Sequence, residues 1–179
     1  MHVTPATVEK QERWVRDRAP AVVVLVNETR ERLGEEFDVA VDPITERQYH
    51  DVVDDVFADG DLAVNVATLV ALLRELDVQD DYPGFVVDEV LGRELAGMIA
   101  GDQPLRLLAE ATFHYADVTT HAVPADGEAG DADEETGRDT DGETASAGAD
   151  DLDAALAAGV QTRLPGWPWR ETASPFTPE

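Results

Sequence analysis

The chain has 179 residues, of which 39 are acidic and 13 are lysine or arginine, so its formal net charge is −26 at pH 7. It contains no cysteine, which excludes disulfides, thiolate metal sites and cysteine nucleophiles. The length suits one domain with a hydrophobic core, and the strong acidity argues against binding to nucleic-acid phosphates.

The N-terminal part predicts two helices and an extended connector. The first helix is expected to start at Thr4-Pro5 and to end before Pro20. The valine-rich run that follows favours a strand by composition, but it continues into a charged, helix-forming stretch, so we predict one helix over residues 21–33. Residues 37–42 alternate apolar and acidic side chains, and without a partner strand they are expected to form an extended connector.

Two further helices are predicted up to residue 76. The first is expected to start at Asp42-Pro43 and to bury a stripe with i, i+3, i+4, i+7 and i+8 spacing. That stripe consists of Tyr49, Val52, Val53, Val56 and Phe57. The second is expected to be capped by Asp61 and to cover residues 62–76. Because it is apolar nearly all round, we expect it to be the central helix of a bundle.

Two more helices complete the predicted helical domain. After a turn with strong helix breakers at 80–84, one helix is expected over 85–100, with Gly101 as its stop. The next begins near Pro104 and runs to about His121. No stretch alternates strand and helix, so the sequence predicts an all-α protein, a bundle of five or six helices.

Residues 124–151 differ in composition from the rest of the chain. They contain no large apolar or aromatic side chain, and acidic residues dominate them. Such a segment cannot bury enough apolar area to offset its loss of conformational entropy, so we expect a disordered acidic linker. This divides the chain into a helical domain, 1–123, the linker, and a C-terminal part, 152–179. The C-terminal part is expected to hold a short helix over 152–158 and a Pro/Trp tail.

The tail has the most distinctive local sequence. Trp167, Pro168 and Trp169 are consecutive, and Phe176 also follows a proline. Proline limits the entropy lost on docking, and tryptophan offers a large apolar surface with an N–H donor. Exposed tryptophans in concentrated salt would promote aggregation, because salt strengthens apolar association. We therefore predict that these four residues bind a protein surface, in the same chain, in a dimer mate or in a different partner protein.

Histidine and carboxylate side chains share two predicted helix faces. Glu110, His114, Asp117 and His121 follow one another at i, i+4, i+7 and i+11. An earlier helix carries His50 between two carboxylates. If these faces met, they would offer ligands for a divalent metal such as Zn, Mn or Fe. The spacing matches neither the Glu-x-x-His motif of di-iron bundles nor the His-Glu-x-x-His zinc motif, so a metal-binding bundle is kept as an alternative.

No catalytic residue is assigned from the sequence. The two serines, Ser146 and Ser174, lie in the predicted linker and tail, and neither a Gly-x-Ser-x-Gly elbow nor a P-loop is present. A helix-turn-helix over 61–100 would make a DNA-binding regulator, but its loop at 77–83 is long and acidic. We expect a non-enzymatic, adaptor- or chaperone-like protein-interaction module without a cofactor.

The charge balance also predicts an environment. Lys10 is the single lysine, and every other basic residue is an arginine. At about 1 M ionic strength the Debye length falls to about 3 Å, which screens the repulsion between carboxylates. The pattern resembles the proteomes of salt-in halophiles, notably the haloarchaea. Residues 1–14 have no apolar signal-peptide core and the longest apolar run, 62–73, is too short for a bilayer, which favours a cytoplasmic location.

Overall fold

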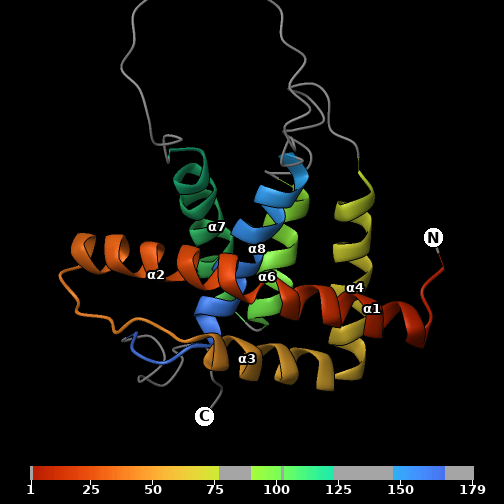
Figure 1. Cartoon of the computed structure of the whole chain (residues 1–179). Coiled ribbons are helices and arrows are strands. Elements are labelled where there is room, and N and C mark those ends of the chain that lie inside the picture. Colours follow the sequence, from red (N-terminus) through yellow and green to blue (C-terminus); the bar gives the residue numbers. More distant parts are fainter. Residues whose placement is uncertain (1, 77–89, 102, 123–146, 168–179) are drawn as a thin grey trace, which may run out of the picture.

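A computed structural model describes residues 2–76, 90–101, 103–122 and 147–167. Within these residues it contains seven helices and no strand (Figure 1). The prediction of an all-α bundle is therefore confirmed. Most of the predicted acidic linker lies outside the described residues, and its last five positions belong to a helix that begins at Ala147.

Helices α1 (Pro5–Asp17) and α2 (Ala19–Glu36) follow one another across the bundle (Figure 1). Thr4 caps α1, because its hydroxyl oxygen accepts a backbone N–H of the first turn at 3.2 Å. A proline stands in the first turn of each helix, where its missing N–H is not needed. The valine-rich run is helical, as predicted, since its side chains pack into the core. The buried apolar residues of α2 are Ala19, Val22, Val23, Leu25 and Val26.

Helix α3 (Glu46–Ala58) starts later than Asp42, where the sequence predicted its start. Thr45 is its N-cap and forms a capping box with Gln48. The Gln48 N–H donates to Thr45 Oγ1 at 3.4 Å, and the Thr45 N–H donates to Gln48 Oε1 at 3.0 Å. The predicted stripe is buried at Tyr49, Val52, Val53 and Val56 and half-buried at Phe57.

Helix α4 (Gly60–Glu75) is capped by Asp59, whose Oδ1 accepts a first-turn N–H at 3.2 Å, and not by Asp61 as predicted. The expectation that it is the central helix is also wrong, because Val64 is 43% exposed and Leu72 is 38% exposed.

In the described ranges no single helix is long and apolar enough to cross a membrane. The pair α3 and α4, bent by 110°, meets that criterion by length and composition only.

Helix α6 (Arg93–Ala100) follows a π-helical turn at 90–92. The first part of the predicted helix over 85–100 lies outside the described residues. Gly101, with φ of 87°, ends α6 as predicted, in a backbone conformation that glycine adopts without strain. Helix α7 (Leu105–Ala122) then runs back along α6.

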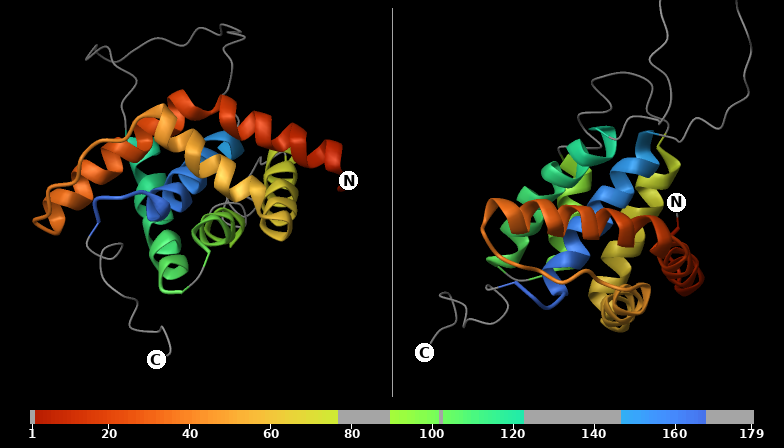
Figure 2. Two further views of the ribbon diagram at one scale, coloured as in Figure 1. Left: turned by 90° about the horizontal axis from the view of Figure 1, so that it is seen from below. Right: turned by 60° about the vertical axis from the view of Figure 1, so that its left-hand side comes forward.

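The centre of the bundle is α8 (Ala147–Arg163), which packs against α2, α6 and α7 (Figures 1 and 2). The sequence predicted a shorter helix here, in a C-terminal part separate from the helical domain. In the structure every residue from Asp151 to Thr162 is buried. The described portion of the C-terminal part therefore belongs to the same core as the helices before it.

Small side chains explain how α8 fits at the centre. Its sequence is rich in alanine, and Gly159 faces α6. A Cβ on Gly159 would lie 2.7 Å from Ile99 Cβ and 2.9 Å from Ala96 O. These distances are too short for a side chain, so the glycine permits the close approach of α6 and α8.

A charge pair joins α8 to the junction between α1 and α2. Arg18 Nε donates to Asp153 Oδ1 at 2.9 Å, and Arg18 Nη2 contacts Asp153 Oδ2. Tyr49 is fully buried, and its hydroxyl donates to Val15 O at 2.7 Å. Burial is the main cause that raises the pKa of Tyr49; the charge of Asp153 raises it further, and Arg18 and Arg16 lower it.

Candidate functional site

The chain leaves α8 in a turn that buries Trp167. Leu164 is 2% exposed and Trp167 is 0% exposed. Gly166 has φ of 99°, and a Cβ at this position would lie 2.9 Å from Arg30 Nη2. Glycine therefore lets the turn close tightly onto α2, which places the indole of Trp167 in the interior.

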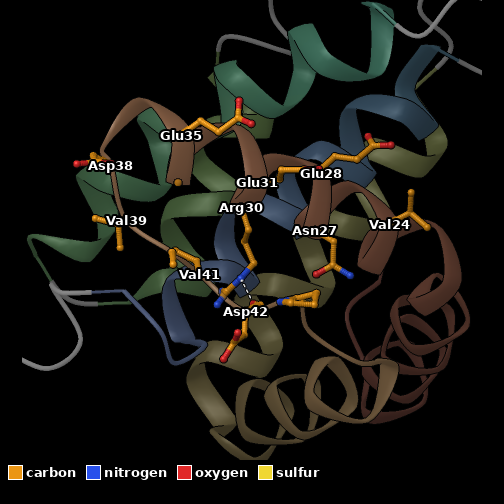
Figure 3. Close-up of a pocket in the computed structure, with 13 residues that line it drawn as sticks. Val24, Asn27, Glu28, Arg30, Glu31, Glu35, Asp38, Val39, Val41 and Asp42 are labelled. Atoms are coloured by element: carbon orange, nitrogen blue, oxygen red, sulfur yellow. Dashed lines mark hydrogen bonds between the residues drawn. The ribbon is translucent and has the colours of Figure 1, made fainter.

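Arg30 of α2 holds this turn from the opposite side. Its guanidinium carbon lies 5.5 Å from the ring centroid of Trp167, which is a cation–π distance. Arg30 Nη2 donates to Pro165 O at 2.7 Å. Arg30 Nε donates to Asp42 O at 3.0 Å, as the dashed line in Figure 3 shows. One side chain thus joins α2, the connector after it and the C-terminal turn.

The guanidinium of Arg30 is almost completely buried, with the residue 3% exposed. Burial lowers the pKa of Arg30, and the charge of Asp42 partly offsets this effect. The contacts of Arg30 described above are with two backbone carbonyls and an indole face. Arg30 Nη1 has no hydrogen-bond partner among the described residues. A buried cation is costly unless it is well solvated by the protein, so these contacts have to compensate for lost water.

The connector over residues 37–44 runs back along α2 (Figure 3). At its far end, Asn27 Nδ2 donates to Ile44 O at 3.1 Å, and the Ile44 N–H donates to Asn27 Oδ1 at 2.7 Å. At its near end, the Val39 N–H donates to Gly34 O at 2.8 Å. A Cβ on Gly34 would lie 2.7 Å from Val39 O, so a glycine is required for this approach.

A groove of about 890 Å³ lies between α2 and the connector (Figure 3). Its carboxylates come from both walls: Glu28, Glu31, Glu35, Asp38 and Asp42. Val24, Val39 and Val41 add apolar surface. Arg30 is the one basic residue among those that line it. Val24 is 57% exposed, so the groove presents both apolar and anionic groups to solvent.

The four tail residues predicted to bind a protein surface fall into two groups. Trp167 lies in the described structure and is buried within the same chain. Pro168, Trp169 and Phe176 lie outside the described residues. Of this set, the described structure therefore shows the buried Trp167, which anchors the C-terminal turn, and the groove beside it.

The predicted metal ligands are distributed over two helices. Those on α7 are Glu110, His114, Asp117 and His121, of which the side chain of the last lies outside the described part. On α3, His50 Nε2 donates to Arg16 O at 3.3 Å. Glu110 Oε1 accepts a hydrogen bond from Arg106 Nε at 3.1 Å. Among the described side chains, no group of three or more His, Asp or Glu residues is placed to hold a metal ion.

Arg30 and Asn27 were not predicted as site residues, although the sequence carries a signal for Arg30. It lies at i+4 from Val26 and at i+8 from Val22, so it continues the apolar stripe of α2. An arginine on such a stripe indicates a buried guanidinium that needs acceptors or aromatic faces. The groove itself has no sequence signal, because the path of the connector depends on contacts with Asn27 and Gly34 that periodicity does not indicate.

Comparison with protein-family models matches residues 1–179 to a family described as "Domain of unknown function (DUF7984)". No curated protein and no solved structure matches the chain.

Proposed function

This chain belongs to the DUF7984 family, and we propose that it is a non-enzymatic protein-interaction module, adaptor- or chaperone-like in role, whose C-terminal segment 168–179 binds a partner protein. The burial of Trp167 against Arg30 is the observation that supports this best. The anchor fixes the start of the segment at one place on the body. A segment presented in this way loses less entropy on binding than one at the end of a free chain.

The composition of the segment suits recognition by a protein surface. Trp169 and Phe176 supply large apolar areas. Pro168 and Pro175 restrict the backbone of the unbound segment, which reduces the entropy lost on binding. Aromatic side chains dominate the binding energy of many interfaces, where removing one costs about 2 kcal/mol or more. The expected partner therefore has an apolar groove with an acceptor for an indole N–H.

We place this activity in a saline environment. A net charge of −26 on 179 residues causes strong self-repulsion in dilute buffer, and counterions screen it at molar salt. The same conditions strengthen apolar contacts. Recognition by aromatic residues is thus better suited to such a medium than recognition by charge alone.

A photo-crosslinking amino acid at Thr172, between the aromatic residues, tests this function in cells. It should capture a protein that the same group at the exposed Leu72 of α4 does not capture. The captured partner is then purified and titrated against the full-length chain in molar KCl. Trp169→Ala and Phe176→Ala should each weaken binding about tenfold or more, whereas Thr172→Ala should change it less than twofold. No capture, or equal affinities for all these variants, would refute the function.

A further inference from the structure

The groove between α2 and the connector adjoins the end of the described C-terminal turn. A Cβ on Gly166 would lie 3.3 Å from Val41 Cγ1 and 2.9 Å from Arg30 Nη2. Val41 and Arg30 both line the groove. The chain beyond Trp167 therefore starts at the wall of the groove.

We infer that this groove is a binding site for the chain's own residues 168–179, which occupy it when no partner is bound. This role rests on the proposed function, because the segment that the partner takes is the one that the groove holds. It gives the groove a defined ligand, an aromatic and proline-containing peptide with one basic and two acidic residues.

The match between the segment and the groove is mainly apolar. Arg170 is the single basic residue of the segment and can pair with the groove carboxylates, while Glu171 and Glu179 leave the segment net acidic and are screened from those carboxylates at molar salt. In Figure 3, Glu28 and Glu35 project from α2, and Asp38 and Asp42 lie on the connector. Trp169 and Phe176 match the apolar surface that the exposed Val24 contributes. In concentrated salt the apolar contacts become stronger, while direct ion pairs act only at close range.

The dimensions also agree. The α2 wall of the groove extends from Val24 to Glu35, which is about 17 Å at the helical rise of 1.5 Å per residue. The nine residues from Pro168 to Phe176 have a root-mean-square reach of about 17 Å as a flexible coil. The segment can therefore place its aromatic side chains along the whole groove without moving the anchor at Trp167.

The short tether makes occupancy high even for a weak contact. A segment tethered beside its site has an effective concentration on the order of 1 mM. With an intrinsic Kd of about 0.1 mM, the groove would be occupied about nine-tenths of the time, and a partner competing for the segment would bind about tenfold more weakly. The groove thus sets a threshold for partner binding.

The absence of native cysteine allows a direct test on the purified full-length chain. Ser174→Cys is combined with Glu31→Cys in the groove or, as a matched control, with Glu36→Cys. Glu36 is also exposed on α2, but it does not line the groove. When oxidised glutathione is added as the oxidant to dilute protein in molar KCl, the intramolecular disulfide should form at least tenfold faster with the groove position. Rates within twofold of each other would overturn the inference.

Two further outcomes are decisive. Adding Trp169→Ala and Phe176→Ala should slow the groove disulfide to the control rate, and an unchanged rate would show that the aromatic residues do not hold the segment there. Disulfide-linked dimers in place of the intramolecular product would assign the groove to the tail of a second copy. The disulfide experiment contains no partner protein, so it tests the groove separately from the proposed function. Equal disulfide rates would refute groove binding and leave partner binding by the segment standing, whereas failure to capture a partner would refute the proposed function and leave groove binding standing.

Discussion

Replacing Arg30 by methionine removes the guanidinium that joins α2, the connector and the C-terminal turn, and keeps a similar apolar stem. The variant loses two hydrogen bonds from a charged donor, to Asp42 O and Pro165 O, each worth about 1.5–3 kcal/mol. It also loses the cation–π contact with Trp167, worth about 0.5–2 kcal/mol. Relief from the desolvation of the buried cation offsets part of this. We expect Arg30→Met to lower the free energy of unfolding by about 2–4 kcal/mol.

The assay is urea unfolding in molar KCl, followed by far-ultraviolet circular dichroism, with linear extrapolation to zero urea. The matched control is Arg32→Met, at an exposed position of the same helix, where surface charge contacts contribute about 0–1 kcal/mol. Equal free energies of unfolding for Arg30→Met and Arg32→Met would contradict this expectation. That result would mean that the contacts of Arg30 contribute no net stability to the C-terminal turn.

Three further predictions concern the body that carries the site. Gly159→Ala should lower the free energy of unfolding by about 1–3 kcal/mol. The control Gly60→Ala should be neutral or slightly stabilising, because nothing lies within 4 Å of a Cβ at that position, and equal urea midpoints for the two variants would contradict the close packing of α6 and α8. The pKa of the Tyr49 hydroxyl is raised in the folded protein, so the unfolded chain loses this proton first, at about pH 10, and the free energy of unfolding should fall as pH rises above about 10. Urea unfolding of Tyr49→Phe should show a shallower fall with pH, and an identical fall would contradict this expectation. Asp153→Asn should lower the free energy of unfolding by about 1–3 kcal/mol, because it removes the carboxylate charge from its contact with the partly buried Arg18. Asp54→Asn, which breaks an exposed pair with Arg16, should change it by less than about 1 kcal/mol, and equal losses in urea would contradict the difference in burial.

The sequence predicts best where a helix has one buried and one exposed face. The stripe of α3 is such a case, because a period of 3.6 residues separates its apolar face from its polar one. Helix α8 is the opposite case. It is rich in small side chains and buried almost all round, so its sequence shows no single apolar stripe. Its central place depends on the approach of Gly159 to Ile99, which are far apart in the sequence. Composition alone therefore predicted a short helix outside the helical domain.

Helix starts were misplaced where several acidic residues compete for the cap. Asp42 and Asp61 are acceptable caps by residue type, but Thr45 and Asp59 are the ones whose side chains reach a first-turn N–H. The pair Thr45 and Gln48 has capping-box spacing, which is the stronger signal.

The candidate site was predictable in part. The tryptophans of the tail are visible in the sequence, because large aromatic side chains between prolines need a surface to cover them. Arg30, which contacts Trp167, was not assigned, since charged residues are rarely fully buried. The groove depends on how Asn27 and Gly34 hold the connector against α2, and these long-range contacts leave no periodic trace.

Trp167 is held inside the body, and the solvent accessibility of its indole can be measured directly. The chain has three tryptophans, so replacing Trp14 and Trp169 by phenylalanine leaves Trp167 as the only indole. Acrylamide quenching of its fluorescence in molar KCl should be at least fivefold weaker in the folded protein than in urea. Quenching of the folded protein that equals the value in urea would contradict the anchor.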